Sequence, residues 1–151
     1  MSKNSLQSNR RAIEILLVED NAADARLTVE QLKQCTVCNH VSVAEDGEKA
    51  MAFLHREGQY MNAPRPDLVI LDLNLPRKDG RQVLAEMKCD PLLRQIPVII
   101  LTTSGAKEDV DKCYHLHANC YLTKPVDLEG FTTVIEATED FWLKAVRLPA
   151  P

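Results

Sequence analysis

The sequence lacks any apolar run near the roughly 20 residues that a membrane-spanning helix needs, and its polar start, M-S-K-N-S-L-Q-S-N-R-R, lacks the apolar core of a signal peptide. It also lacks an excess of basic residues, since 18 Lys and Arg stand against 22 Asp and Glu. Nucleic-acid phosphates are bound by clustered Lys and Arg, so a net charge of −4 argues against a nucleic-acid partner. We therefore expect a cytoplasmic protein that binds neither membranes nor nucleic acid.

The sequence also lacks a paired set of cysteines. Its five cysteines are an odd number and lie scattered along the chain, at Cys35, Cys38, Cys89, Cys113 and Cys120. The first two match C-x-x-C, but no second pair and no His at ligand spacing follow them. We interpret the cysteines as reduced thiols and apolar filler, rather than as a disulfide framework, a redox centre or a metal site.

A chain of 151 residues, 45% of them hydrophobic, suits one globular domain. We expect a flexible N-terminus at 1–11, a domain at 12–146 and a tail at 147–151. Short apolar runs predict strands at 13–18, 40–44, 68–72, 98–101 and 120–123. Between them, amphipathic segments predict helices that begin near 21, 46, 76, 105 and 128, the last two ending near 117 and 146.

This strict alternation of five strands with five helices is typical of a parallel sheet with helices on both faces. The strands are nearly continuous apolar runs, as expected when both faces of a sheet are buried. The sequence therefore predicts a doubly wound α/β fold with the strand order 2-1-3-4-5. In such folds ligands bind beyond the carboxyl ends of the strands, where the strand order reverses.

One residue contradicts this apolar pattern: Asp72 interrupts the run L-V-I-L-D-L-N-L. A lone carboxylate costs several kcal/mol to desolvate unless it is paired, hydrogen-bonded or bound to a cation. The acids Glu19 and Asp20 end the first strand, Thr102 ends the fourth and Lys124 follows the fifth. Because the carboxyl ends of parallel strands share one edge, we expect these side chains to surround Asp72.

Three carboxylates, with a backbone carbonyl near Asn74 and water, would offer Mg²⁺ the oxygen ligands it prefers. Asp72 could then act as a nucleophile toward a phosphoryl group, since positioned carboxylates form aspartyl phosphates. Thr102 could hydrogen-bond one phosphoryl oxygen, and Lys124 could pair with another.

Each residue also has a purely structural interpretation. Glu19 and Asp20 could be charges at a helix N-terminus, Thr102 a β-branched strand residue, and Lys124 part of an ordinary turn. An acid inside an apolar strand has fewer such explanations. Four separate elements that bring an acid pair, an acid, a hydroxyl and a lysine to one edge favour the functional interpretation.

The motifs L-L-V-E-D-N, V-I-L-D-L-N-L-P-x-x-D-G, P-V-I-I-L-T-T-S and Y-L-T-K-P resemble those of the receiver domain of two-component response regulators. The resemblance covers roughly residues 12–146 and implies a flavodoxin-like fold. It implies that Asp72 accepts a phosphoryl group from a histidine kinase. Asp20, Asp72 and the Asn74 backbone would bind Mg²⁺, and Glu19 would act largely through water, while Thr102 and Lys124 hold the phosphoryl group.

The resemblance also implies a switch. Thr102 would move toward the phosphoryl group and Tyr121 would turn inward, which would remodel the face formed by the fourth helix, fifth strand and fifth helix. It implies a cis peptide bond before Pro125, and slow autodephosphorylation set partly by Asn74 and Ser104. Such a protein is a phospho-accepting signalling protein rather than an enzyme.

A narrower resemblance is to the small response regulators of cyanobacterial phytochromes, carried by P-R-P-D-L-V-I-L-D-L-N-L-P-R-K-D-G-R-Q-V-L-A-E-M-K, H-A-N-C-Y-L-T-K-P and F-W-L-K-A-V-R-L-P. It implies a stand-alone receiver that forms homodimers and takes phosphate from a light-sensing histidine kinase. The apolar stripe of the last predicted helix extends to Phe141 and Trp142, which we expect at an interface with a partner or a second copy.

Two alternatives have different chemistry. An aspartyl-nucleophile phosphatase generally has a general acid two residues after the nucleophile, where this chain has Asn74, which cannot deliver a proton. A pseudo-receiver would act as an adaptor without phosphorylation. The intact acids, Thr102 and Lys124 argue against it.

Overall fold

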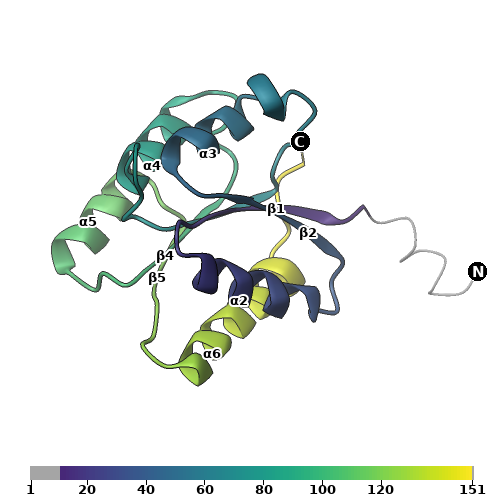
Figure 1. The fold of residues 1–151 in the computed structure, drawn as a ribbon, viewed down its shortest axis with the longest axis vertical. Helices are drawn as coiled ribbons and strands as arrows, with labels where there is room; N and C mark the ends of the chain where they lie inside the picture. The colour runs from purple at the N-terminus through teal and green to yellow at the C-terminus, as the bar shows by residue number, and fades with distance from the viewer. Residues whose placement is uncertain (1–10, 151) are drawn as a thin grey trace, which may run out of the picture.

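The structure, a computed structural model, describes residues 11–150. Its centre is a parallel sheet in the order β2-β1-β3-β4-β5, as predicted (Figure 1). The strands are β1 (Ile13–Val18), β2 (Asn39–Ala44), β3 (Leu68–Leu71), β4 (Val98–Thr102) and β5 (Cys120–Thr123). Among the described residues, no helix has the length and apolar character to cross a membrane.

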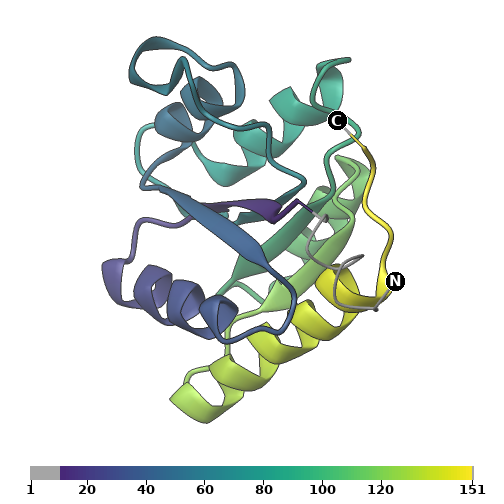
Figure 2. The same cartoon turned by 90° about the vertical axis from the view of Figure 1, so that its right-hand side faces the viewer.

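Helices cover both faces of the sheet, as the predicted doubly wound fold requires (Figures 1 and 2). One face carries α3 (Gly47–Leu54), α4 (Gly80–Cys89) and α5 (Lys107–His115). The other face carries α2 (Ala22–Lys33) and α6 (Leu128–Thr138), which lie side by side. A short 3-10 helix, η1 (Gly58–Tyr60), interrupts the long connection between α3 and β3.

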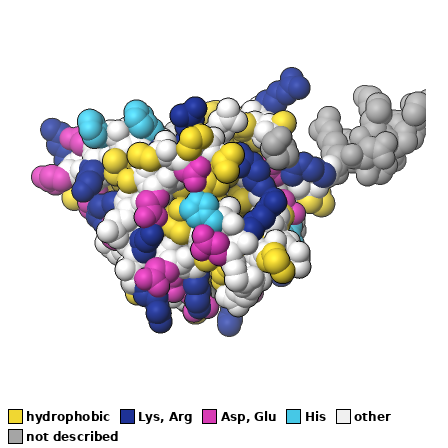
Figure 3. All heavy atoms as spheres, turned by 90° about the horizontal axis from the view of Figure 1, so that it is seen from above, with side chains coloured by type: hydrophobic (Ala, Val, Ile, Leu, Met, Phe, Trp, Pro, Cys, Tyr) yellow, Lys and Arg dark blue, Asp and Glu magenta, His cyan; other side chains and the backbone are white. Residues whose placement is uncertain are grey.

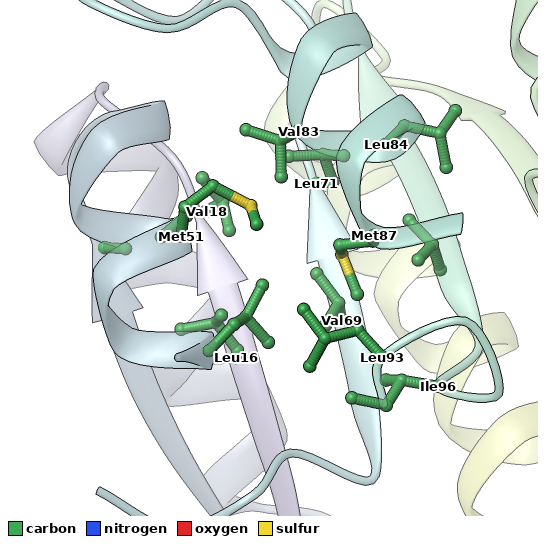
Figure 4. Close-up of a cluster of buried hydrophobic side chains, with 14 of the residues drawn as sticks. Leu16, Val18, Met51, Val69, Leu71, Val83, Leu84, Met87, Leu93 and Ile96 are labelled. Atoms are coloured by element: carbon green, nitrogen blue, oxygen red, sulfur yellow. The ribbon is translucent and has the colours of Figure 1, made fainter. Parts of the chain in front are cut away.

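The core consists of two apolar layers because successive strand residues point to opposite faces. Leu16 and Val18 face α3 and α4, whereas Ile15 and Leu17 face α2 and α6. Figure 4 shows the first layer, where strand and helix side chains interlock, among them Val69, Leu71, Met51, Val83 and Met87. Each fully buried side chain of this kind contributes about 1.5 to 3 kcal/mol.

The starts of three helices are fixed by side-chain caps. Asn21 accepts from the backbone N–H of Asp24 at 3.0 Å and caps α2, as predicted. Asp46 caps α3, and Asp79 starts α4 with a capping box. Two of these helices, α2 and α4, are the next helices after β1 and β3, and the predicted site acids follow these two strands. Their caps therefore fix the backbone next to the site.

The last predicted helix is shorter than expected. α6 ends at Thr138, and Glu139–Ala145 form a π-helical segment, η2. The N–H of Val146 donates to the carbonyl of Phe141, five residues earlier, at 2.8 Å. The wider turn shifts the apolar stripe, so that Leu143 is buried where the predicted helical spacing placed Trp142.

One further prediction needs correction. The described residues contain no cis peptide bond, so the expected cis bond before Pro125 is wrong for this structure. Residues 1–10 of the predicted flexible N-terminus lie outside the described residues. The remaining one, Arg11, is anchored, because its guanidinium donates to both carboxylate oxygens of Asp67 at 2.9 and 2.6 Å.

Charges of both signs are interspersed on the face that carries α3 and α4, with apolar side chains between them (Figure 3). Ion pairs explain part of this mixture, such as Lys78 with Glu86 at 2.8 Å.

Candidate functional site

The predicted residues Glu19, Asp20, Asp72, Thr102 and Lys124 meet at the carboxyl edge of the sheet, where β1, β3, β4 and β5 end (Figure 1). Hydrogen bonds between neighbouring strand ends hold this edge together. The N–H of Asp72 donates to the carbonyl of Val18 at 3.0 Å, and the N–H of Lys124 donates to the carbonyl of Thr102 at 2.6 Å. The backbone therefore fixes where these side chains start.

Lys124 is the centre of the site. Its buried ammonium donates to Glu19, to Asp72 Oδ2 at 3.0 Å and to Asp24 Oδ2 at 3.0 Å. The positive charge of Lys124 thereby offsets part of the cost of burying the Asp72 carboxylate at the end of an apolar strand. An ammonium has three N–H donors, and here each has a carboxylate acceptor.

Asp24 is a site residue that the sequence interpretation missed. It lies in the first turn of α2, where an acid is also favoured by the helix dipole. The sequence signal was weak: Asp24 is an acid in the first turn of the helix that follows the acid pair Glu19-Asp20.

Three acids form a cluster that could hold a cation. Glu19, Asp20 and Asp72 each offer a carboxylate oxygen, and these oxygens lie within 4.8 Å of one another. Glu19 and Asp72 are buried, whereas Asp20 is exposed. Hard oxygen donors of this kind fit Mg²⁺ or a similar divalent ion. Asn74 is exposed near the cluster, with its backbone N 3.4 Å from Asp72 Oδ1.

Burial and Lys124 act against each other on the two buried acids. Burial raises the pKa of Glu19 to about 7, despite its hydrogen bond from Lys124. Burial would also raise the pKa of Asp72, but the hydrogen bond and charge of Lys124 outweigh it, so this pKa is lowered. For Lys124, the two acids outweigh burial and raise its pKa. Asp72 and Lys124 are therefore charged at neutral pH.

Thr102 presents an unsatisfied hydroxyl. Its side chain is fully buried at the end of β4, and its Oγ1 has no hydrogen-bond partner among the described residues. Leaving a buried polar group unpaired costs about 1 to 3 kcal/mol. The hydroxyl is thus available to a group that is bound at the carboxyl edge.

The predicted switch residue Tyr121 is turned inward in this structure. It packs against the apolar layer under α3 and α4, and its hydroxyl donates to the carbonyl of Ser104 at 2.7 Å. Ser104 in turn donates to Asp109 at 2.5 Å, and Arg81 donates to the same carboxylate at 2.6 and 3.1 Å. This network ties the loop after Thr102 to α4 and α5, and no sequence pattern indicated it.

Gly80 explains how α4 approaches the site so closely. A Cβ at this position would lie 2.1 Å from the backbone carbonyl oxygen of Asp72. Any other residue would push the start of α4 away from the strand end that carries the acid.

The predicted interface residues lie on η2. The Phe141 side chain is 57% exposed, and Trp142 is half-buried against the layer under α2 and α6. Their rings meet edge to face, with centroids 5.4 Å apart. Beside them is a shallow groove that reaches the edge strand β5, lined by Cys120, Leu122, Ala137, Thr138, Phe141 and Trp142.

A five-stranded sheet in this order, with acids, a threonine and a lysine gathered at one carboxyl edge, defines the receiver domains of response regulators. Residues 15–136 match the family model described as response regulator receiver domain, and the chain belongs to this family. Its relatives include phytochrome response regulators. The chain is 53% identical over 136 residues to response regulator Rcp1 of Synechocystis sp., covering 90% of this chain and 92% of Rcp1.

Two solved structures are similar in fold and sequence. The Mn²⁺-bound form of Rcp1 has a TM-score of 0.89 at 52% identity, and covers 91% of this chain and 99% of that one. The phosphorylated cyanobacterial phytochrome response regulator RcpA has a TM-score of 0.90 at 50% identity, and covers 93% of this chain and 100% of that one. The first relative binds a divalent metal, and the second is phosphorylated.

Proposed function

We propose that this chain is a response regulator in which Asp72 accepts a phosphoryl group from a histidine kinase in a Mg²⁺-dependent reaction. The observation that carries the proposal is the buried Asp72 carboxylate, paired with Lys124 beside the acid cluster and the unpartnered Thr102 hydroxyl. These groups match the needs of phosphoryl transfer: a nucleophile, and donors for the phosphoryl oxygens.

In the transfer step, a carboxylate oxygen of Asp72 forms a bond to phosphorus while the bond between phosphorus and the donor's imidazole nitrogen breaks. Lys124 and the Thr102 hydroxyl bind phosphoryl oxygens as they approach the carboxylate. Glu19, Asp20, Asp72 and the Asn74 carbonyl would hold Mg²⁺, which offsets the negative charge of the acids and the phosphoryl group.

The test is to incubate the chain with Mg²⁺ and a labelled small phosphodonor such as acetyl phosphate. We expect one acid-labile phosphate per chain, and loss of labelling when the metal is removed with EDTA, because the acids then repel the incoming phosphate. Adding back Mg²⁺ in excess should restore it. Equal labelling with and without metal would contradict the Mg²⁺ dependence.

A phytochrome-type histidine kinase is the partner that the relatives suggest, since RcpA is a cyanobacterial phytochrome response regulator. Such a kinase would meet this chain in the cytoplasm. Mixing the chain with several phosphorylated candidate kinases identifies the cognate one as the kinase that loses its label fastest. If phytochrome-type kinases keep their label while another kinase loses it, this choice of partner is wrong.

The pH dependence of Mg²⁺ binding follows from Glu19. Its pKa is raised from 4.5 to about 7, so the folded protein holds the proton in a range where the unfolded chain has released it. Glu19 therefore lowers the free energy of unfolding of the metal-free protein as the pH rises from 4.5 through about 7. Below that pKa, a bound cation must displace the proton.

We expect the apparent Mg²⁺ affinity, measured by calorimetry, to fall up to about tenfold per pH unit below this pKa. Glu19→Gln should bind Mg²⁺ more weakly and lose this pH dependence. The pKa of Asp72 is lowered from 3.8, so Asp72 does not contribute to the pH dependence between pH 5 and 8. A wild-type affinity that is constant from pH 5 to 8, a range of about three decades in proton concentration, would contradict this assignment.

Phosphorylation should act through the loop after Thr102. When Thr102 moves to a phosphoryl oxygen, the loop that contains Ser104 follows, and this loop contacts both Tyr121 and Asp109. The face formed by α5, β5 and α6 therefore changes shape, which is the proposed output. Autodephosphorylation should be slow, with Asn74 and Ser104 beside the path of the attacking water.

A second copy of the chain is the proposed partner for the η2 surface. Phe141 is more than half exposed, and the groove beside it is mostly apolar. Phe141→Glu should shift the protein toward monomer in analytical ultracentrifugation, because each interface would then bury an unpaired charge. Val43→Glu, at a partly exposed valine on the other edge strand, is the control. An unchanged oligomeric state in Phe141→Glu would contradict this interface.

A further inference from the structure

The three acceptors on Lys124 leave its ammonium no free donor. Glu19, Asp72 and Asp24 each take one of its N–H groups. Lys124 can bind a phosphoryl oxygen only if one of these carboxylates gives way. The resting site therefore contains a competition for Lys124 that a phosphoryl group has to win.

The three carboxylates differ in how easily they can be released. The side chains of Glu19 and Asp72 are only 4% and 9% exposed, so releasing either would leave a buried, unpaired charge. The Asp24 side chain is 29% exposed, and water can replace its lost partner. Asp24 is thus the carboxylate whose release costs least.

Local structure allows this release without disturbing α2. The backbone N–H of Asp24 is held by the Asn21 cap at 3.0 Å, and the buried neighbours Ala25 and Thr28 pack the helix in place. Asp24 contacts Lys124 through its side chain and not through its backbone. Its carboxylate can turn to solvent while the helix start stays fixed.

We propose that Asp24 is a positioning residue that occupies, in the resting protein, the Lys124 donor that a phosphoryl oxygen takes over on phosphorylation. This inference rests on the proposed function of Asp72. Asp24 holds the Lys124 ammonium in place, and it adds to the free energy that an incoming phosphoryl group must supply to recruit the lysine. It does not touch the reacting atoms.

The test uses the full chain with Mg²⁺ and beryllium fluoride, a stable mimic of a phosphoryl group on a carboxylate. Asp24→Asn should bind beryllium fluoride about five- to tenfold more tightly than wild type, because a neutral amide oxygen competes less strongly for the Lys124 ammonium than a carboxylate does. Asp24→Glu restores the carboxylate and should return the affinity toward wild type. Glu45→Gln removes a charge after the neighbouring strand β2, where the partner is Lys49 at 3.3 Å, and should have little effect.

A second readout needs no phosphoryl group. In ¹⁵N NMR of the lysine side chains, the protons of the Lys124 ammonium should exchange with water faster in Asp24→Asn than in wild type, because a weaker, neutral acceptor replaces one of the three carboxylates. Mg²⁺ affinity should fall slightly, since one negative charge near the cluster is removed. A merely structural role would instead weaken beryllium fluoride and Mg²⁺ binding together.

The outcomes separate the two proposals. If wild type binds beryllium fluoride but Asp24→Asn binds it no more tightly, or Glu45→Gln tightens it equally, the role of Asp24 is overturned and that of Asp72 stands. If wild type with Mg²⁺ fails to bind beryllium fluoride at all, the proposed function fails and this inference falls with it.

Discussion

Asp72→Asn should abolish the incorporation of phosphate from a small phosphodonor or a kinase. The amide has the size of the carboxylate but lacks the negative oxygen that attacks phosphorus, and every other group of the site stays in place. The effect should be a loss of at least about a thousandfold in rate, the scale expected when a nucleophile is removed. Labelled phosphate per chain, counted after acid and neutral washes, measures it.

The matched control is Asp67→Asn, at the opposite end of the same strand. Asp67 is also buried and also pairs with a cation, Arg11, but it lies at the amino edge, away from Lys124. This variant should lose some stability and keep its labelling. Labelling that persists in Asp72→Asn, or that disappears equally in Asp67→Asn, would show that Asp72 is not the acceptor.

Lys124→Met should have the largest effect on stability. Removing the ammonium leaves Glu19 and Asp72 buried without a counter-ion, which typically costs about 3 to 5 kcal/mol. The free energy of unfolding, measured by urea titration without metal, should fall by about this amount. Phosphate incorporation should fall as well, because the ammonium that binds a phosphoryl oxygen is missing.

Mg²⁺ distinguishes this mechanism from a simple loss of packing. In the proposed site the ion would bind the same acids in the folded chain, so at a hundred times its Kd it should restore about 2.7 kcal/mol. Lys88→Met is the control, since the half-buried Lys88 donates to the carbonyls of Arg94 and Ile96 and to Asn119 rather than to an acid. Its loss of stability should be smaller and independent of Mg²⁺. A Lys124→Met variant that Mg²⁺ does not stabilise would contradict the proposal that Mg²⁺ and Lys124 interact with the same acids.

Much of the fold could be predicted because the parallel sheet has a simple signature. Apolar runs such as V-I-L and V-I-I-L are buried on both faces, and both are strands in the structure. The end of the chain could not be predicted in the same way. A helix and a π-helix use the same residue types, and only the tertiary packing of Leu143 decides between the two registers.

The candidate site was predictable where topology alone determines it. Strand order brings together four residues that end or follow strands: Glu19, Asp72, Thr102 and Lys124. Asp24 was missed because it belongs to a helix, and its role depends on how far its side chain reaches from α2. The contacts of Arg81 with Asp109 depend likewise on the relative placement of two helices, which no local pattern specifies.

The alternatives differ from the proposal at defined residues. A phosphatase would need a general acid near Asp72, and the side chain two residues on is the amide of Asn74. A pseudo-receiver would have no use for an unpartnered Thr102 hydroxyl beside a charged acid and lysine. Both observations favour phosphate acceptance.

The most direct measurement is to map the phosphoryl group on the wild-type chain. Borohydride reduces an aspartyl phosphate to a stable product, and mass spectrometry of the digested chain locates the reduced residue. We predict a single site, at Asp72, that forms only when Mg²⁺ and a phosphodonor are both present. Reduction at Asp20 or at another carboxylate, with Asp72 unmodified, would contradict the account.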